Sequence, residues 1–215
     1  MFNLIGAISL LSLSFAAGAE IQPWRNYKNL PDLKVVYTVS KDGIYHIYAE
    51  LFVADARTAQ LLTLLYNTQQ ASQWLHAVQE VRLLHSQGNR NRVYTVINSP
   101  WPVADRELYT QSCYQRVNDY TTELRVHAYN PNIARKSDRV RITTLTANWR
   151  MTQQDDGLLI RYQVFADPGG KLPRWLSNKV SLKSVSKTMM SLKSQLAAVQ
   201  ALQVAPISAG DCGED

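Results

Sequence analysis

The sequence contains few of the residues that build metal and catalytic sites. Its 215 residues include two cysteines and four histidines, with no CxxC pair and no two histidines at ligand spacing. A Gly-x-Ser-x-Gly elbow, an HExxH helix and a phosphate-binding glycine loop are also missing. Metal sites, elbow-type hydrolases, zinc proteases and P-loop enzymes are therefore disfavoured. The sequence suggests no metal, no cofactor and no catalytic residue.

The longest apolar run is too short to cross a bilayer as a helix. It covers residues 4–17, which carry no charged side chain, whereas a spanning helix needs about 20 residues. It is followed by Gly18 and Ala19, and Ala-Gly-Ala is a small-x-small site typical of signal peptidase cleavage. The sequence therefore predicts a signal peptide at 1–19, cleavage before Glu20, and export to the periplasm or beyond. Because the first residues lack Lys and Arg, a buried N-terminal helix or an uncleaved anchor remains an alternative.

Two cysteines leave a single disulfide pairing to consider. Cys113 lies in a predicted strand and Cys212 in a polar tail near the C-terminus. An oxidising compartment would permit a bridge between them. A buried thiol together with an unpaired tail thiol fits the sequence equally well, so both states stay open.

The chain carries a net charge of +6, from 23 Lys and Arg against 17 Asp and Glu. Such a protein can bind nucleic acid or an anionic membrane surface, and an exported protein rarely meets nucleic acid. Lys179, Lys183 and Lys187 are spaced by four residues and share one helix face, which predicts transient contact with anionic lipid head groups. The solvated side of an ordinary amphipathic helix explains the same spacing.

Most of the chain has the pattern of strands joined by short turns. Turns this short make neighbouring strands antiparallel, and Asp42-Gly43 is a hairpin signal. Strands are predicted at 33–39, 44–53, 81–86, 92–98, 107–116, 121–129, 139–151 and 158–166. Helical patterns cover 55–66 and 68–78, with Asp55 and Thr68 as N-caps, and a short segment opened by Trp24 and Tyr27 is also predicted to be helical.

One long amphipathic helix closes the protein. Prolines and glycines at 168–173 prevent a regular element before Leu172. Apolar residues then recur every three or four positions, at Trp175, Leu176, Val185, Met189, Leu192, Leu196 and Val199. This stripe must pack on the sheet, and a strongly curved sheet around a helix leaves apolar space inside. An apolar ligand would fill that space, at a gain of about 0.8 kcal/mol for each buried methylene.

Two segments resemble a known family. Residues 99–109 read Ser-Pro-Trp-Pro-Val-Ala-Asp-Arg-Glu-Leu-Tyr, and residues 167–178 read Asp-Pro-Gly-Gly-Lys-Leu-Pro-Arg-Trp-Leu-Ser-Asn. With the order of elements, they resemble the steroidogenic acute regulatory protein-related lipid transfer (START) domain, especially its bacterial members. Glu107 stands where the family more often has Asp. The resemblance implies an α+β helix-grip (START/Bet v 1-like) fold, in which a curved antiparallel sheet wraps around the long C-terminal helix. It also implies a tunnel for one hydrophobic molecule, and no catalysis.

These observations predict one monomeric lipid-binding domain at 20–203, followed by a flexible tail at 204–215. Pro100 and Pro102 hold Trp101 either at the pocket mouth or as a plug at the end of the sheet. Arg106 is expected to bind a polar head group or a structural carboxylate. The predicted ligand contacts are Trp101, Arg106, Tyr109, Val126, Trp149, Tyr162, Trp175 and Met189.

The predicted function is non-catalytic binding of a lipid or other hydrophobic ligand, with transfer between membranes. One alternative is a helix-grip enzyme, a cyclase or hydrolase, that uses a buried acid such as Asp105, Glu107 or Glu123 as a base. The other alternative is an envelope scaffold that binds a second protein.

Overall fold

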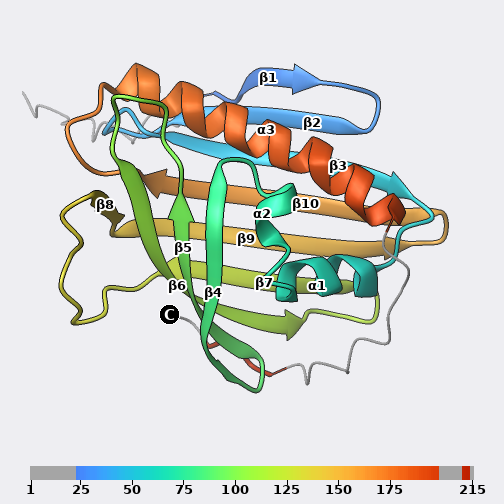
Figure 1. Ribbon diagram of the computed structural model, residues 1–215. Helices are drawn as coiled ribbons and strands as arrows, with labels where there is room; N and C mark the ends of the chain where they lie inside the picture. The colour runs from blue at the N-terminus through green and yellow to red at the C-terminus, as the bar shows by residue number, and fades with distance from the viewer. Residues whose placement is uncertain (1–22, 199–209, 214–215) are drawn as a thin grey trace, which may run out of the picture.

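The computed structural model describes residues 23–198 and 210–213. These residues form ten strands and three helices (Figure 1). The strands are β1 (Arg25–Asn29), β2 (Leu33–Val39), β3 (Tyr45–Ala54), β4 (Val78–Gln87), β5 (Arg90–Ile97), β6 (Asp105–Arg116), β7 (Thr121–Ala128), β8 (Arg139–Ile142), β9 (Thr144–Gln154) and β10 (Gly157–Asp167). The helices are α1 (Thr58–Tyr66), α2 (Ala71–Trp74) and α3 (Arg174–Ala198).

All ten strands belong to one sheet. Nine follow the order β1-β2-β3-β10-β9-β7-β6-β5-β4, and every neighbouring pair on this path is antiparallel. The three helices lie on one face of the curved sheet, the inner face, and α3 runs along it (Figure 1). The predicted helix-grip architecture is therefore confirmed.

Three predicted elements differ from the structure. The segment opened by Trp24 and Tyr27 is strand β1 rather than a helix, because it pairs with β2. The second predicted helix shrinks to α2, since β4 already begins at Val78. The predicted strand 139–151 is two strands, β8 and β9. Because β8 pairs parallel with β6, the expectation that all strand pairs are antiparallel was wrong there.

The two short helices also begin later than predicted. The N-cap of α1 is Arg57, whose backbone N–H donates to Gln60 Oε1 at 2.6 Å. The N-cap of α2 is Gln70. Asp55 instead occupies a left-handed turn, with φ of 60°, so neither Asp55 nor Thr68 caps a helix.

The outer face of the sheet carries a second, smaller buried cluster made by Tyr94, Val96 and Tyr109. The 130–138 loop closes over it, because buried Arg141 donates to Ile133 O at 2.9 Å and to Ala134 O at 3.2 Å. Arg141 also pairs with buried Glu107 at 2.6 Å. A buried charge needs such a partner, so this pair fixes the loop on the sheet.

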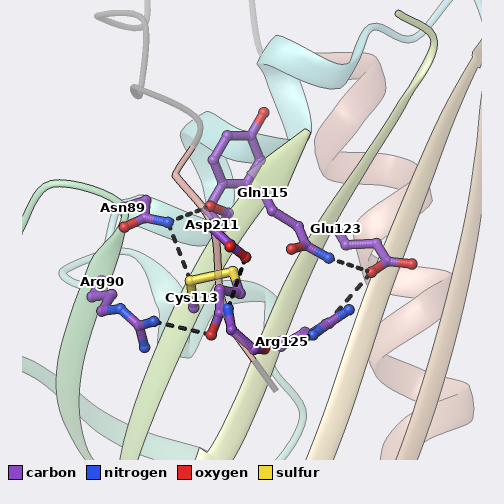
Figure 2. The surroundings of a disulfide bond; sticks show 10 residues. Asn89, Arg90, Cys113, Gln115, Glu123, Arg125 and Asp211 are labelled. Carbon is purple, nitrogen blue, oxygen red and sulfur yellow. Dashed lines mark hydrogen bonds and ion pairs between the residues drawn. A yellow bond between two sulfur atoms is a disulfide. The ribbon is translucent and has the colours of Figure 1, made fainter. Parts of the chain in front are cut away.

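Cys113 and Cys212 form a disulfide, which settles the alternative that the sequence left open. Residues 210–213 lie on the outer face beside β6 (Figure 2). Arg90 donates to Cys212 O at 3.0 Å and Arg125 to Gly213 O at 3.3 Å. A Cβ on Gly210 would come within 2.5 Å of Asn89 Nδ2, so glycine permits this close approach. Both sulfurs are covered, since each cysteine is almost fully buried.

Candidate functional site: an apolar cavity under the C-terminal helix

A partly open cavity of about 240 Å³ lies between α3 and the inner face of the sheet. Its walls are mostly aliphatic and come from α3, from six strands (β3, β5, β6, β8, β9 and β10) and from the segments that connect them. The apolar side chains that line it include Ile44, Ile47, Ile97, Val103, Ile142, Leu145, Val164, Leu172, Leu176, Val180 and Val185. Such a cavity suits an apolar guest, because hydrocarbon surface leaves water when it enters.

The space exists because the first half of α3 presents small side chains to the sheet. Ser177, Ser181 and Ser184 recur at three- and four-residue spacing and all line the cavity. In the second half of the helix, Met189 and Leu192 are fully buried in the main core. A serine side chain is too short to reach the sheet as a leucine side chain does, so these serines leave space between the helix and the sheet.

Arg106 is the one cationic side chain among the described residues that line the cavity. It comes from the start of β6 and is only 5% exposed. Its guanidinium donates to Ser99 Oγ at 3.1 Å and to Ala104 O, both of which are uncharged acceptors. Burial lowers the pKa of Arg106 from its ordinary value, and the neighbouring Asp105 carboxylate partly opposes that shift. A buried cation without a paired carboxylate is costly, so this site favours an incoming anionic or strongly polar oxygen.

Asp105 is engaged elsewhere, although it is adjacent to Arg106 in sequence. Its Oδ1 accepts the Ser99 N–H at 2.8 Å, which holds the loop before β6 in place. No carboxylate in the described ranges 23–198 and 210–213 forms an ion pair with Arg106. Within these ranges Arg106 is therefore not part of a structural ion pair.

An aromatic wall closes the inner end of the cavity. Tyr162 lines the cavity and lies against Trp149, with ring centroids 4.1 Å apart. Trp149 in turn meets Trp74 of α2 edge-on at 6.5 Å. Burial raises the pKa of Tyr162 well above its ordinary value, so its hydroxyl stays neutral. Trp74 and Trp149 belong to the main hydrophobic core, and Tyr162 packs against it.

Two loops form the other end, which we call the mouth. They are residues 98–104, before β6, and residues 168–173, before α3. Gly169 and Gly170 have φ of 64° and 73°, a region that L side chains disfavour. A Cβ on Gly170 would lie 3.8 Å from Arg106 Nη2, so this loop passes beside the buried cation.

Large aromatic side chains project from the mouth into solvent. Trp101 is 93% exposed and Trp175 is 68% exposed. Their neighbours Pro100 and Leu176 line the cavity, so both indoles stand beside the opening rather than inside it. Exposed tryptophan of this extent is uncommon in a protein that meets only water.

Comparison with known proteins identifies the family. The START domain model matches residues 16–203 of the 215-residue chain. The chain belongs to the START domain family. An uncharacterised protein of Pseudomonas aeruginosa is 26% identical over 180 residues, which cover 83% of this chain and 89% of that protein.

Solved structures share the fold of this START domain. The STAR-related lipid transfer protein of Xanthomonas axonopodis aligns with a TM-score of 0.74 and 24% identity, over 81% of this chain and 98% of that chain. Human STARD10 aligns with a TM-score of 0.72 and 19% identity, over 81% and 73% of the two chains. At these identities the likeness establishes the architecture of the START domain.

The predicted ligand contacts fall in four different places. Arg106 and Tyr162 line the cavity. Trp149 and Met189 are buried in the main core, and Val126 is packed against it. Tyr109 belongs to the outer-face cluster, because alternate residues of β6 point to opposite faces. Trp101 and Trp175 are exposed at the mouth, and Lys179, Lys183 and Lys187 are exposed along α3.

The sequence interpretation missed the three cavity-facing serines. Their spacing on one face of a helix was a usable signal, since Ser177, Ser181 and Ser184 follow the same three- and four-residue rhythm as the apolar stripe. Candidate ligand contacts chosen by hydrophobicity exclude serine. Such a choice selects large side chains that fill the core and overlooks small side chains that border a cavity.

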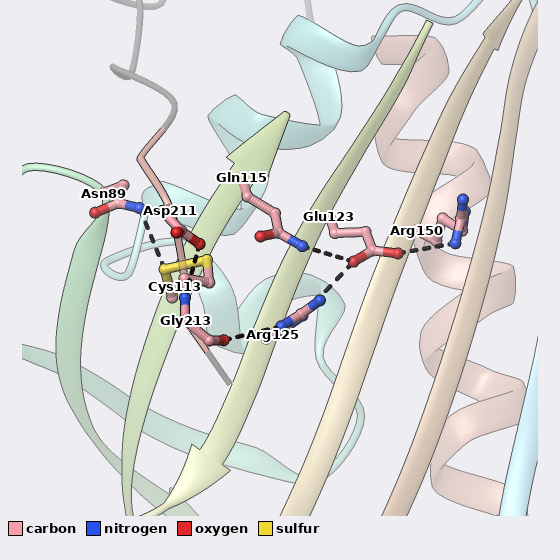
Figure 3. Close-up of polar contacts among 9 residues, drawn as sticks. Asn89, Cys113, Gln115, Glu123, Arg125, Arg150, Asp211 and Gly213 are labelled. Carbon is pink, nitrogen blue, oxygen red and sulfur yellow. Dashed lines mark hydrogen bonds and ion pairs between the residues drawn. A yellow bond between two sulfur atoms is a disulfide. The ribbon is translucent and has the colours of Figure 1, made fainter. Parts of the chain in front are cut away.

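The acids considered as catalytic bases all have structural partners. Glu107 pairs with Arg141 on the outer face. Glu123 accepts from Gln115 Nε2 at 3.1 Å and from Arg150 Nη1 at 2.9 Å, and Arg125 lies 3.6 Å away (Figure 3). Within the described residues no group of three or more His, Cys, Asp or Glu side chains gathers as a metal site would. None of the described helices combines the length and apolarity needed to cross a membrane.

Proposed function

We propose that this START domain binds a lipid or other hydrophobic molecule without catalysis and carries it between membranes. The observation that carries the proposal is the apolar cavity with a buried arginine at its mouth end, which forms no ion pair with the described residues 23–198 and 210–213. Each methylene that enters contributes about 0.8 kcal/mol. A charged hydrogen bond from Arg106 adds about 1.5–3 kcal/mol. An amphiphile with an anionic or polar head and an apolar body gains both contributions to its binding free energy.

The mouth is the proposed docking surface on a donor or acceptor membrane. Tryptophan favours the interface between head groups and acyl chains, and Trp101 and Trp175 are exposed beside the opening. Exposed Lys171 and Lys179 flank them, and each basic side chain near an anionic surface contributes about 1 kcal/mol. Lys183 and Lys187 extend this attraction along α3. No nucleic acid is involved in the proposal, and the protein acts as a monomer.

Export is part of the same proposal. Buried disulfides belong to oxidising compartments, and the Cys113–Cys212 bridge supports a periplasmic or secreted location. The predicted signal peptide at 1–19 lies outside the described residues, as do positions 204–209 and 214–215 of the tail predicted at 204–215. The disulfide and the predicted signal peptide together support a carrier in the cell envelope rather than in the cytosol.

Two measurements test the binding and docking. Mass spectrometry of lipid that copurifies with the mature protein should find an apolar molecule in a defined ratio. Extraction of a labelled fatty acid from vesicles should be faster when the vesicles contain anionic lipid. If no apolar molecule copurifies and no fatty acid is extracted from the vesicles, the binding proposal is refuted. Equal extraction rates from neutral and anionic vesicles would refute docking through the basic side chains.

The role of Arg106 has a sharper test. Arg106→Gln should weaken palmitate binding by about 2 kcal/mol, or about 30-fold, while binding of hexadecanol, the uncharged alcohol of the same chain length, stays within about threefold. Isothermal titration of both probes measures the difference. Arg116→Gln, an exposed arginine at the end of β6, is the charge-matched control. Equal losses for palmitate and hexadecanol would show that Arg106 only supports the fold.

A further inference from the structure

A surface cleft of about 510 Å³ lies on the other side of the cavity wall, between α2 and α3. Its lining includes Gln73, His76, Lys187 and Met190. Ala77 and Asn98 line both this cleft and the apolar cavity. The wall between the two spaces is therefore one layer of chain thick, and it is made by the connector between α2 and β4, residues 75–77.

Helix α3 holds this connector in place through two hydrogen bonds to one connector residue, His76. The Thr188 Oγ1 accepts the backbone N–H of His76 at 3.0 Å, and the Ser184 hydroxyl donates to the carbonyl of the same residue at 3.2 Å. We call this pair of hydrogen bonds the latch. On the β5 side, Asn98 N–H donates to Ala77 O at 2.7 Å.

The connector has a strained backbone where the wall is thinnest. Ala77 has φ of 65°, and a residue with a Cβ adopts this left-handed region only when its surroundings impose it. The latch and the Asn98 hydrogen bond impose it here. Separating α3 from the connector would break the latch. It would also let the Ala77 backbone leave its strained conformation, and this relaxation lowers the free-energy cost of local opening.

We propose that the cavity has a second opening at this place, a side portal between the middle of α3 and residues 75–77, closed by the latch. The inference rests on the proposed function, since a portal serves a protein whose ligand enters and leaves. The hydrocarbon part of the ligand passes sideways between Ser184 and Ala77. The polar head can stay near Arg106, because the portal opens away from the mouth loops.

The cleft has the chemistry that such a passage needs. Met190 is 47% exposed and offers a flexible apolar contact for a chain that emerges. Lys183 is exposed beside the latch residues, and Lys187 lies at the rim of the cleft, so both can face anionic head groups. A lipid leaving through the portal would therefore move from the cavity to a membrane surface along a short apolar path.

The test measures the release of a fatty acid that carries an environment-sensitive fluorophore. In the double variant Ser184→Ala, Thr188→Val the latch is absent, and the release rate should rise about tenfold, which corresponds to about 1.4 kcal/mol. The equilibrium dissociation constant should change less than the release rate, because entry is accelerated too. Thr188→Ser, which keeps the acceptor oxygen, and Ser194→Ala, an exposed serine of the same helix, are the controls and should behave like the wild type.

Hydrogen exchange separates the portal from general loosening. In the double variant, exchange should accelerate at the amides of residues 76–78 and stay unchanged in the far half of α3, from Met189 to Ala198. Acceleration of both regions, or an unchanged release rate with binding intact, would overturn the portal. If the wild-type protein does not bind the probe at all, the proposed function fails first, and the portal fails with it.

Discussion

The two halves of α3 meet the same sheet in opposite ways. From Arg174 to Val185 the helix borders the cavity, which it lines with three serines and with Leu176, Val180 and Val185. From Met189 to Leu196 the helix packs tightly on Leu61, Leu64 and Ile160 in the main core. Both halves have the same periodicity and similar backbone geometry. The difference lies in what the side chains meet, since those of the first half border the cavity and those of the second half are buried in the core.

This division assigns separate tasks along one element. The solid half supplies stability, since fully buried leucines contribute the most free energy per residue. The half that borders the cavity, the hollow half, contributes Leu182 to the core, with Val185 packed against it, and its cavity-lining side chains can respond to a ligand. The disulfide and the tail contacts of residues 210–213 lie on the outer face of the sheet, away from the cavity, and so they strengthen the fold without touching the cavity.

The largest expected effect comes from a truncation in the solid half. Leu192→Ala should lower the free energy of unfolding by about 2–5 kcal/mol, because it leaves a void in a packed core. Val185→Ala, in the hollow half, should cost only about 1 kcal/mol, since Val185 already borders empty space. Urea denaturation of both variants measures the contrast. Equal losses would mean that the two halves are packed alike and that the hollow is not a property of the helix.

Most of this architecture was readable in the sequence, because strand periodicity and helix periodicity are local. The positions of Leu192 and Leu196 in the core follow from the apolar stripe alone. The assignment of Tyr109 to the cavity failed for a physical reason. A strand residue is expected to face the core when it is large and apolar, but the 130–138 loop creates a second buried environment on the outer face.

The same limit applies to β8 and to the cavity serines. Nothing local in residues 139–142 indicates that their partner is β6 in parallel, since that pairing depends on where a distant loop returns. The latch likewise joins residues 76, 184 and 188, which are far apart in sequence. Patterns within one element predict its type and its face, whereas contacts between elements require the fold.

A filling substitution should have the next largest effect and the opposite sign for stability. Ser181→Leu places an aliphatic side chain in the cavity, so binding of palmitate should fall at least tenfold, about 1.4 kcal/mol. The free energy of unfolding should rise by about 1 kcal/mol, because apolar area is buried in existing space and leucine favours the helix. Ser194→Leu, on the exposed side of α3, is the matched control. A variant that keeps full affinity would place the ligand outside this cavity.

The smallest expected effect is a pH dependence at the junction of the two halves. Burial, followed by the charges of Lys187 and Lys183, lowers the pKa of His76 from its ordinary value of 6.5. The unfolded chain therefore takes up a proton at His76 more readily than the folded protein does. The free energy of unfolding should decrease as the pH falls from about 6.5 toward the lowered pKa, and the decrease should be smaller in His76→Asn.

Salt distinguishes the two causes of this dependence. Repulsion between a protonated His76 and the exposed lysines is screened at high ionic strength, whereas the cost of burying the charged imidazole is not. Because burial is the larger cause, most of the difference between wild type and His76→Asn should persist in 1 M NaCl. A difference that disappears in salt would mean that the lysines dominate, and that His76 is solvated and only loosely held against α3.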